Sequence, residues 1–175
     1  TRPEVDVLLA APDKSTWNGR RDHALLLTTL QTGLRLSEVT GLQRQHVTFG
    51  TGAHLEVLGK GRKQRAVPLC KPVADVLEAW LDELSPAQDD IVFPSVRGGR
   101  LSADAVARLL KKHIAVASDA CPSLKQKNIT FGEPGRPLSI IDKAQVELLK
   151  PDDTGQDKLL GRRAQGHLDR PQVAL

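Results

Sequence analysis

A short segment carries the residue types that bind a phosphate group. Residues 32–39 read TGLRLSEV, which places Arg35 just after a glycine and Glu38 one helical turn later. An arginine beside the start of a helix can present two N–H groups to two oxygens of one phosphate. A carboxylate one turn along can hold that guanidinium in a fixed orientation. We therefore predict that Arg35 binds phosphate and that Glu38 supports it.

A second basic segment follows further along the chain. Residues 57–69 read VLGKGRKQRAVPL, with glycines on both sides of the first cation. Four cations lie within six residues of this segment: Lys60, Arg62, Lys63 and Arg65. Glycines allow the backbone to approach a partner closely, and phosphate contacts dominate the affinity of proteins for nucleic acid. The segment is therefore a candidate for contact with a nucleic-acid backbone.

Each segment alone also has an ordinary explanation. An Arg–Glu pair at a helix start is often a surface ion pair, and a glycine-rich basic tip is often a solvated loop. The glycines match neither the phosphate-binding loop of nucleotide hydrolases nor the dinucleotide fingerprint. The argument for phosphate chemistry therefore rests on the two segments together.

The surrounding pattern predicts the elements that position these segments. Residues 3–11 and 20–32 predict helices, with Gly33 as the stop of the second. Ser37 is placed to cap a short helix over residues 37–44. Residues 54–58 alternate in the manner of a strand, and residues 64–69 read as its returning partner, so we predict a β-hairpin.

Helices resume after the hairpin. Apolar residues recur at helical spacing over 73–84, ended by Pro86, and again after a cap at Ser102. Residues 91–93 are a short strand or a loop anchor. Residues 131–175 are interrupted by proline and glycine, and only 140–149 look periodic enough for a helix. We predict that they form a divergent tail that is disordered or weakly helical.

The order and spacing of the two motifs resemble one family. Residues 1–130 are similar to the first part of the catalytic domain of tyrosine recombinases, or phage integrases, through T-G-L-R-x-S-E and G-K-G-x-K-x-R-x-V-P-L. The segments RRD at 20–22 and FPS at 93–95 also resemble the family. The resemblance implies an α+β fold, mainly helical with a small antiparallel hairpin or sheet, as a partial tyrosine recombinase catalytic domain.

The resemblance also implies roles for these residues in DNA strand breakage and rejoining. Arg35 would hold the scissile phosphate and stabilise its transition state, and Lys60 would act as general acid toward the leaving 5′-oxygen. Glu38 would support them, while Arg62, Lys63 and Arg65 would contact the DNA backbone. No metal or other cofactor is expected, because the arginines supply the positive charge.

The chain departs from the family after residue 130. Residues 127–130 resemble the lead-in to an H-x-L-R-H motif, but FGEP follows instead. There is no tyrosine in the chain, so we assign no nucleophile for a covalent intermediate. An H-x-x-R spacing at 167–170 comes too late and is attributed to chance. The chain also starts where the catalytic domain would start, so we expect a truncated or rearranged integrase.

Composition agrees with a nucleic-acid partner. The 175 residues suit one domain with a sizeable core, and the net charge of +4 lies wholly in residues 1–130. No apolar run is long enough for a membrane helix. The expected partner is double-stranded DNA, with further recombinase subunits as an additional candidate and no membrane. Cys70 and Cys121 suit the reduced thiols of a cytoplasmic protein.

Three functional hypotheses remain open at this level. The first is family-type site-specific recombination or integration, in which this chain by itself is catalytically incompetent. The second is a non-catalytic module that binds the phosphate backbone of DNA. The third is a decayed relic. The dispersed histidines, His113 among them, are expected on the surface or partly packed. Trp17 and Trp80 are expected to be too far apart to form a base-stacking platform.

Overall fold

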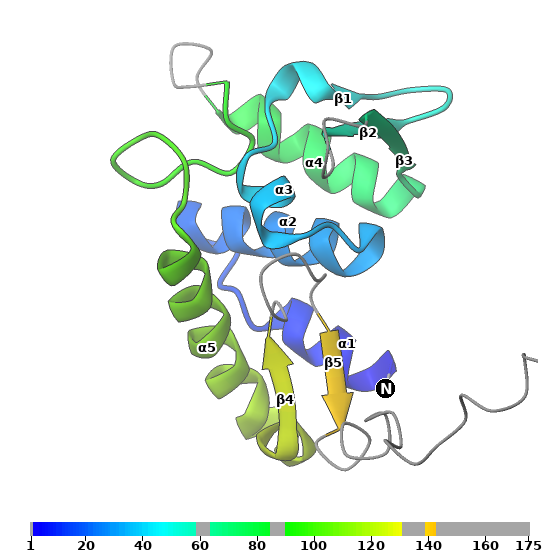
Figure 1. Cartoon of the computed structure of the whole chain (residues 1–175). Helices are drawn as coiled ribbons and strands as arrows, with labels where there is room; N and C mark the ends of the chain where they lie inside the picture. The colour runs from blue at the N-terminus through cyan, green and yellow to red at the C-terminus, as the bar shows by residue number, and fades with distance from the viewer. Residues whose placement is uncertain (1, 59–63, 85–89, 131–138, 143–175) are drawn as a thin grey trace, which may run out of the picture. The chain divides into compact units, whose positions relative to one another are not determined.

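The computed structural model describes residues 2–58, 64–84, 90–130 and 139–142. The chain divides into two units, Thr1–Lys143 and Ala144–Leu175, and all the described residues belong to the first. Five α-helices and two 3-10 helices occur in this described part (Figure 1). They are α1 Arg2–Ala10, α2 Trp17–Thr32, α3 Leu36–Thr40, η1 Arg44–His46, α4 Lys71–Glu83, α5 Ala103–Ala120 and η3 Pro122–Gln126.

A small antiparallel sheet follows α3. Its strands are β1 Val47–Thr48, β2 His54–Leu58 and β3 Gln64–Pro68, in the order β1-β2-β3. Leu55 pairs with Val67 across the central ladder, and Leu55 and Val57 form the buried face of β2. The predicted hairpin and the mainly helical α+β class are therefore confirmed.

Helix α2 ends only a few residues before α3 begins. Gly33 has a φ of 64°, in the left-handed region that favours glycine, and its N–H donates to Thr29 O at 3.0 Å. The predicted stop of this helix is confirmed. The short helix that follows starts one residue earlier than predicted and ends at Thr40 rather than 44. Arg35 itself occupies the N-cap position that the sequence assigned to Ser37.

A second pair of strands lies after α5. Strand β4 Lys127–Thr130 pairs antiparallel with β5 Ser139–Asp142 (Figure 1). The predicted helix over 140–149 is wrong at residues 140–142, because pairing with β4 satisfies their backbone in an extended form. Residues 131–138 and 143–175, and with them most of the predicted tail, lie outside the described residues.

The helices share one apolar core. Helix α2 packs against α4 and α1, and α1 also packs against α5. Val92 and Phe93 are buried, and the indole N–H of Trp80 donates to Val92 O at 2.7 Å. Of the two alternatives for residues 91–93, the structure therefore shows the loop anchor.

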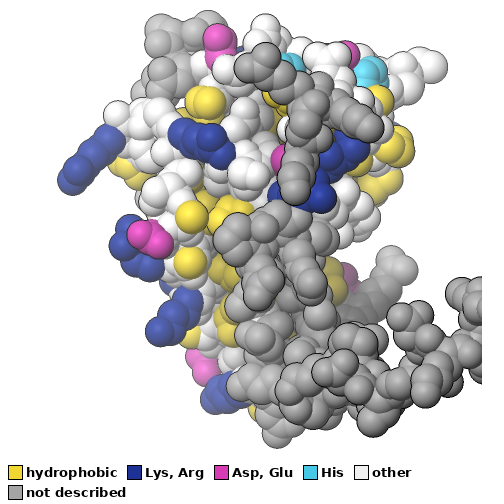
Figure 2. Space-filling model, in the orientation of Figure 1, with side chains coloured by type: hydrophobic (Ala, Val, Ile, Leu, Met, Phe, Trp, Pro, Cys, Tyr) yellow, Lys and Arg dark blue, Asp and Glu magenta, His cyan; other side chains and the backbone are white. Residues whose placement is uncertain are grey.

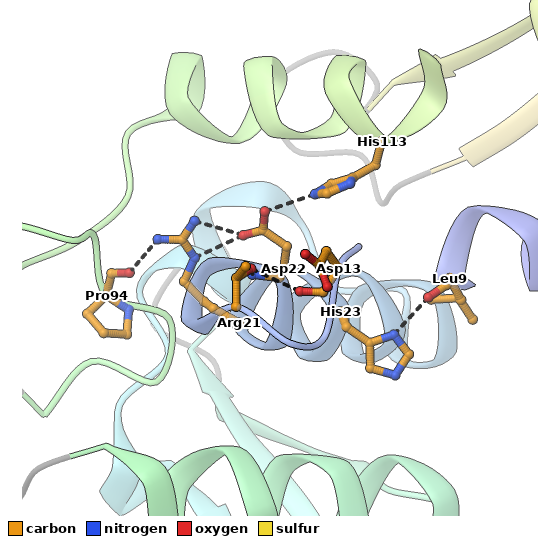
Figure 3. Close-up of polar contacts among 9 residues, drawn as sticks. Leu9, Asp13, Arg21, Asp22, His23, Pro94 and His113 are labelled. Atoms are coloured by element: carbon orange, nitrogen blue, oxygen red, sulfur yellow. Dashed lines mark hydrogen bonds and ion pairs between the residues drawn. The ribbon is translucent and has the colours of Figure 1, made fainter. Parts of the chain in front are cut away.

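A buried polar network joins α2 to α5 (Figure 3). Asp22 accepts from Arg21 Nη2 at 2.7 Å and Arg21 Nε at 3.0 Å, and it pairs with His113 Nε2 at 2.9 Å. Arg21 also donates to Pro94 O at 3.1 Å. His113 is 2% exposed, so its predicted surface or partly packed position is wrong. The correction follows from Asp22, which supplies the partner that a buried imidazole needs.

The two tryptophans also differ from expectation. The ring centroids of Trp17 and Trp80 lie 5.2 Å apart with an interplanar angle of 59°, and the Arg21 guanidinium lies 5.3 Å from the Trp17 ring. The two residues are far apart in the sequence, but the packing of α2 against α4 brings their rings together. The pair is a packing contact between helices, since Trp80 is buried.

Candidate functional site

Arg35 lies at the junction between two helices. Its backbone is extended, with φ −70° and ψ 154°, between the left-handed Gly33 and the first turn of α3. The junction directs the Arg35 side chain outward, and that side chain is 40% exposed. The guanidinium therefore lies at the surface on a backbone that is fixed on both sides.

Glu38 holds Arg35 at two points. The backbone N–H of Arg35 donates to Glu38 Oε2 at 2.9 Å, and Arg35 Nη1 donates to Glu38 Oε1 at 3.2 Å. The Glu38 side chain is only 4% exposed. A buried carboxylate with a fixed geometry thus orients an exposed cation.

Arg65 of β3 binds the same carboxylate. Its Nη1 donates to Glu38 Oε1 and its Nη2 to Oε2, both at 2.9 Å. The Arg65 side chain is 41% exposed. The Arg35–Glu38–Arg65 cluster therefore carries two exposed guanidinium groups on one buried carboxylate, with a formal charge of one positive unit. Sequence reasoning placed Arg65 among DNA contacts but missed its pairing with Glu38.

The electrostatics of the cluster favour its charged form. Burial raises the pKa of Glu38, but the hydrogen bonds from Arg65 and from the Arg35 backbone outweigh it, so the pKa lies below its ordinary value. The hydrogen bond with Glu38 raises the pKa of Arg65. Glu38 and Arg65 are therefore both ionised near neutral pH.

The described part of the hairpin reaches this cluster at the end of its strands that adjoins residues 59–63. Leu58 pairs with Gln64, and the next residue along β3 is Arg65, which contacts Glu38. The predicted general acid Lys60 and the predicted DNA contacts Arg62 and Lys63 lie outside the described residues. The structure thus brings together Arg35, Glu38 and Arg65 from the predicted set.

Lys and Arg side chains also gather on a second part of the surface. Figure 2 shows basic side chains along the edge of the molecule where α5 lies. Exposed basic residues of α5 are Arg108, Lys111 and Lys112. The sequence analysis did not single these residues out; their spacing on an amphipathic helix was the available signal.

The arrangement can bind an oxyanion. Two adjacent guanidinium groups present several N–H donors, and a buried carboxylate keeps them oriented without neutralising both. Preorganised cations of this kind stabilise negative charge that grows on phosphate oxygens during transfer reactions.

A sequence model described as the Phage integrase family matches residues 1–127. The chain belongs to the phage integrase family.

Individual relatives agree with this membership. The chain is 58% identical over 130 residues to the protein named integrase/recombinase y4rC of Sinorhizobium fredii, covering 74% of this chain and 39% of that relative. It is 30% identical over 175 residues to the tyrosine recombinase XerD of Lacticaseibacillus casei, covering 94% of this chain and 58% of the relative. This integrase-family chain thus spans less than two thirds of the length of each of these relatives.

A solved structure shares the fold. The crystal structure of the XerH site-specific recombinase bound to its difH substrate, a pre-cleavage complex, superposes with a TM-score of 0.58 at 26% identity. The match covers 66% of this chain and 36% of that one. The predicted partial recombinase catalytic-domain fold is confirmed.

The proposed domain boundary at residue 130 stays a prediction. None of the described helices is long and apolar enough to cross a membrane.

Proposed function

We propose that this chain belongs to a site-specific DNA recombinase and binds the phosphate backbone of double-stranded DNA. The observation that carries the proposal is the Arg35–Glu38–Arg65 cluster, in which one buried carboxylate orients two exposed guanidinium groups. The structure of XerH, a site-specific recombinase bound to its difH substrate, supports a DNA partner. DNA as the partner also suggests the cytoplasm as the site of action and a role for further recombinase subunits.

In this function, Arg35 binds the scissile phosphate and stabilises the charge that develops on its non-bridging oxygens. Arg65 binds a backbone phosphate and, through Glu38, keeps Arg35 oriented. If a nucleophile from outside these 175 residues attacks the phosphate, Lys60 donates the proton that the leaving 5′-oxygen requires. Arg62 and Lys63 add backbone contacts. The guanidinium groups supply the positive charge, so the reaction as we propose it uses no metal or other cofactor.

The absence of tyrosine from the 175 residues favours a non-catalytic role for this chain taken by itself. Strand cleavage through a covalent intermediate requires a nucleophile, and a phosphotyrosyl bond cannot form without tyrosine. We therefore propose that these residues bind and polarise the phosphate but do not break the strand by themselves.

DNA binding is tested by fluorescence anisotropy with a labelled duplex over a series of salt concentrations. R35Q and R65Q should each weaken binding about tenfold and reduce the slope of log affinity against log salt by about one. The matched control is R20Q, because Arg20 makes the same two-point ion pair with Glu83, at 2.6 and 2.7 Å, between α2 and α4. Equal losses in all three variants would contradict a specific role for the cluster.

Cleavage is tested separately with a nicked duplex that traps covalent intermediates. After denaturation, the chain should run free of DNA on a gel. A band of protein covalently joined to DNA would refute the proposed lack of cleavage and would leave the binding result standing.

A further inference from the structure

Arg100 contacts α3 at the end opposite to Arg35. Its Nη2 donates to Ser37 O at 2.7 Å, and its Nε and Nη2 donate to Thr40 Oγ1 at 3.0 and 2.9 Å. Arg100 belongs to the segment between the buried Phe93 and α5, where it forms an isolated bridge with Pro94. A residue 60 positions away thus supplies three hydrogen bonds to a helix of five residues.

The contact suits the chemistry of a helix C-terminus. The last carbonyls of a helix lack intrahelical partners and carry partial negative charge, so a cation there is favourable. Ser37 O accepts from Gly41 N at 3.2 Å as well as from Arg100. The Thr40 hydroxyl donates to Leu36 O at 2.9 Å, which leaves its lone pairs to accept from Arg100.

Gly41 lies beside this guanidinium. A Cβ at residue 41 would lie 3.0 Å from Ser37 O, 3.4 Å from Arg100 Cζ and 3.5 Å from Arg100 Nη1. The backbone φ of Gly41 is −96°, which any residue can adopt, so space rather than conformation is what the glycine provides. The tight contact would be with the Ser37 carbonyl, and the guanidinium itself would lie at ordinary van der Waals distance from that Cβ.

We propose that Arg100 is a positioning residue that acts through α3 on the Arg35 guanidinium; this inference rests on the proposed function. A helix of five residues is far too short to be stable without tertiary contacts. Arg65 contacts its first turn through Glu38, and Arg100 contacts its last turn. Arg35 caps this helix, so a shift of α3 moves the phosphate-binding group, and displacements of about 1 Å are costly at such sites.

Positioning is distinguished from direct DNA contact by a double-mutant cycle. R100Q in the 175-residue chain should weaken duplex binding about fivefold, but have less than about a twofold effect when Arg35 is already Gln, because both changes act through one group. T40V removes the hydroxyl acceptor without a change of charge and should weaken binding in the same direction. R97Q is the matched control, since it removes the same charge from the same exposed segment and should change binding less than R100Q.

The opposite outcomes overturn the proposal. Equal effects of R100Q in both backgrounds, with a shallower salt slope, would show that Arg100 contacts DNA itself. An affinity unchanged in R100Q would show that it contributes nothing to the site.

A second measurement needs no DNA and keeps this inference separable from the proposed function. The Arg35 amide donates to Glu38, so its hydrogen exchange reports the order of the α3 N-terminus. R100Q should speed this exchange about tenfold relative to wild type, while the Val106 amide in the first turn of α5 keeps its rate. Unchanged Arg35 exchange would refute the positioning role even if the chain binds DNA. Faster exchange in a chain that does not bind DNA would refute the proposed function alone.

Discussion

Arg65 and Glu38 lie 27 residues apart in the chain and form two parallel hydrogen bonds of 2.9 Å each. The pair joins β3 to α3 by the fork-to-carboxylate geometry that only arginine provides. Because Glu38 also accepts from the backbone and side chain of Arg35, one carboxylate links the hairpin strand to the phosphate-binding candidate. The consequences of this link can be measured.

Replacing Glu38 by Gln should weaken DNA binding although it makes the chain more positive. An added positive charge by itself strengthens binding to a polyanion. E38Q, however, removes the anion that orients Arg35 and Arg65, so we expect an affinity several-fold lower than wild type, measured by anisotropy. D75N is the matched control, because it makes the same charge change at the exposed Lys71–Asp75 pair on α4. Tighter binding by E38Q than by D75N would contradict the orienting role.

The stability of the fold should depend on the ionisation of Glu38. Its pKa in the folded chain lies below the ordinary value of 4.5, so the folded state binds fewer protons than the unfolded state in that range. The stabilisation is complete above pH 4.5 and is lost as the pH falls through the folded-state pKa. Urea unfolding from pH 7 down to pH 3 should show this loss in wild type.

The same titration in E38Q isolates the contribution of Glu38. Asp13 and Glu83 also have lowered pKa values, each through its hydrogen-bond partner, and they contribute to both curves. The difference between wild type and E38Q should therefore shrink as the pH falls below 4.5. A difference independent of pH would show that the carboxylate charge does not stabilise the fold.

Replacing Asp22 by Asn should destabilise the chain strongly. Asp22 is the shared partner of the buried Arg21 and His113, and its loss leaves a buried guanidinium without a counter-charge. Removing one partner of a buried ion pair costs about 3–5 kcal/mol. Urea denaturation measures this loss, and E83Q, which breaks a more exposed pair, should lose much less. Similar losses in the two variants would show that the network between α2 and α5 adds little.

Replacing Gly33 by Ala should loosen the junction that presents Arg35. At a φ of 64° an alanine costs about 1–2 kcal/mol. G33A should lower the unfolding midpoint and also weaken DNA binding, because Arg35 lies two residues on. G52A serves as the comparison, since Gly52 has a φ of 79° but lies in the turn before β2. It should lose similar stability and keep its DNA affinity; equal losses of affinity would attribute the G33A effect to unfolding alone.

Local features of the fold were predictable from neighbouring residues. The left-handed stop at Gly33 and the cap at Ser102, whose hydroxyl accepts from Ala105 N at 3.1 Å, depend on contacts within four residues. Helix α4 and strand β2 follow from the periods of 3.6 and 2 that place apolar side chains on one face. The predicted start of the short helix α3 was one residue too late. Arg35 and Ser37 both suit its first turn, and the Arg35 cap is favoured because Glu38 accepts a hydrogen bond from the Arg35 backbone.

The amino-acid sequence by itself determined the family, the succession of helices and hairpin, and Arg35 with Glu38 as candidates for phosphate binding. Only the tertiary structure decided that Arg65 binds Glu38, that Arg100 contacts the end of α3, that His113 is buried against Asp22, and that residues 139–142 form a strand. The physical reason is the distance along the sequence between the residues that interact. Helix stops, caps and periodicity depend on residues a few positions apart, whereas these contacts join side chains or backbones that become neighbours only when the core packs and the strands find their register.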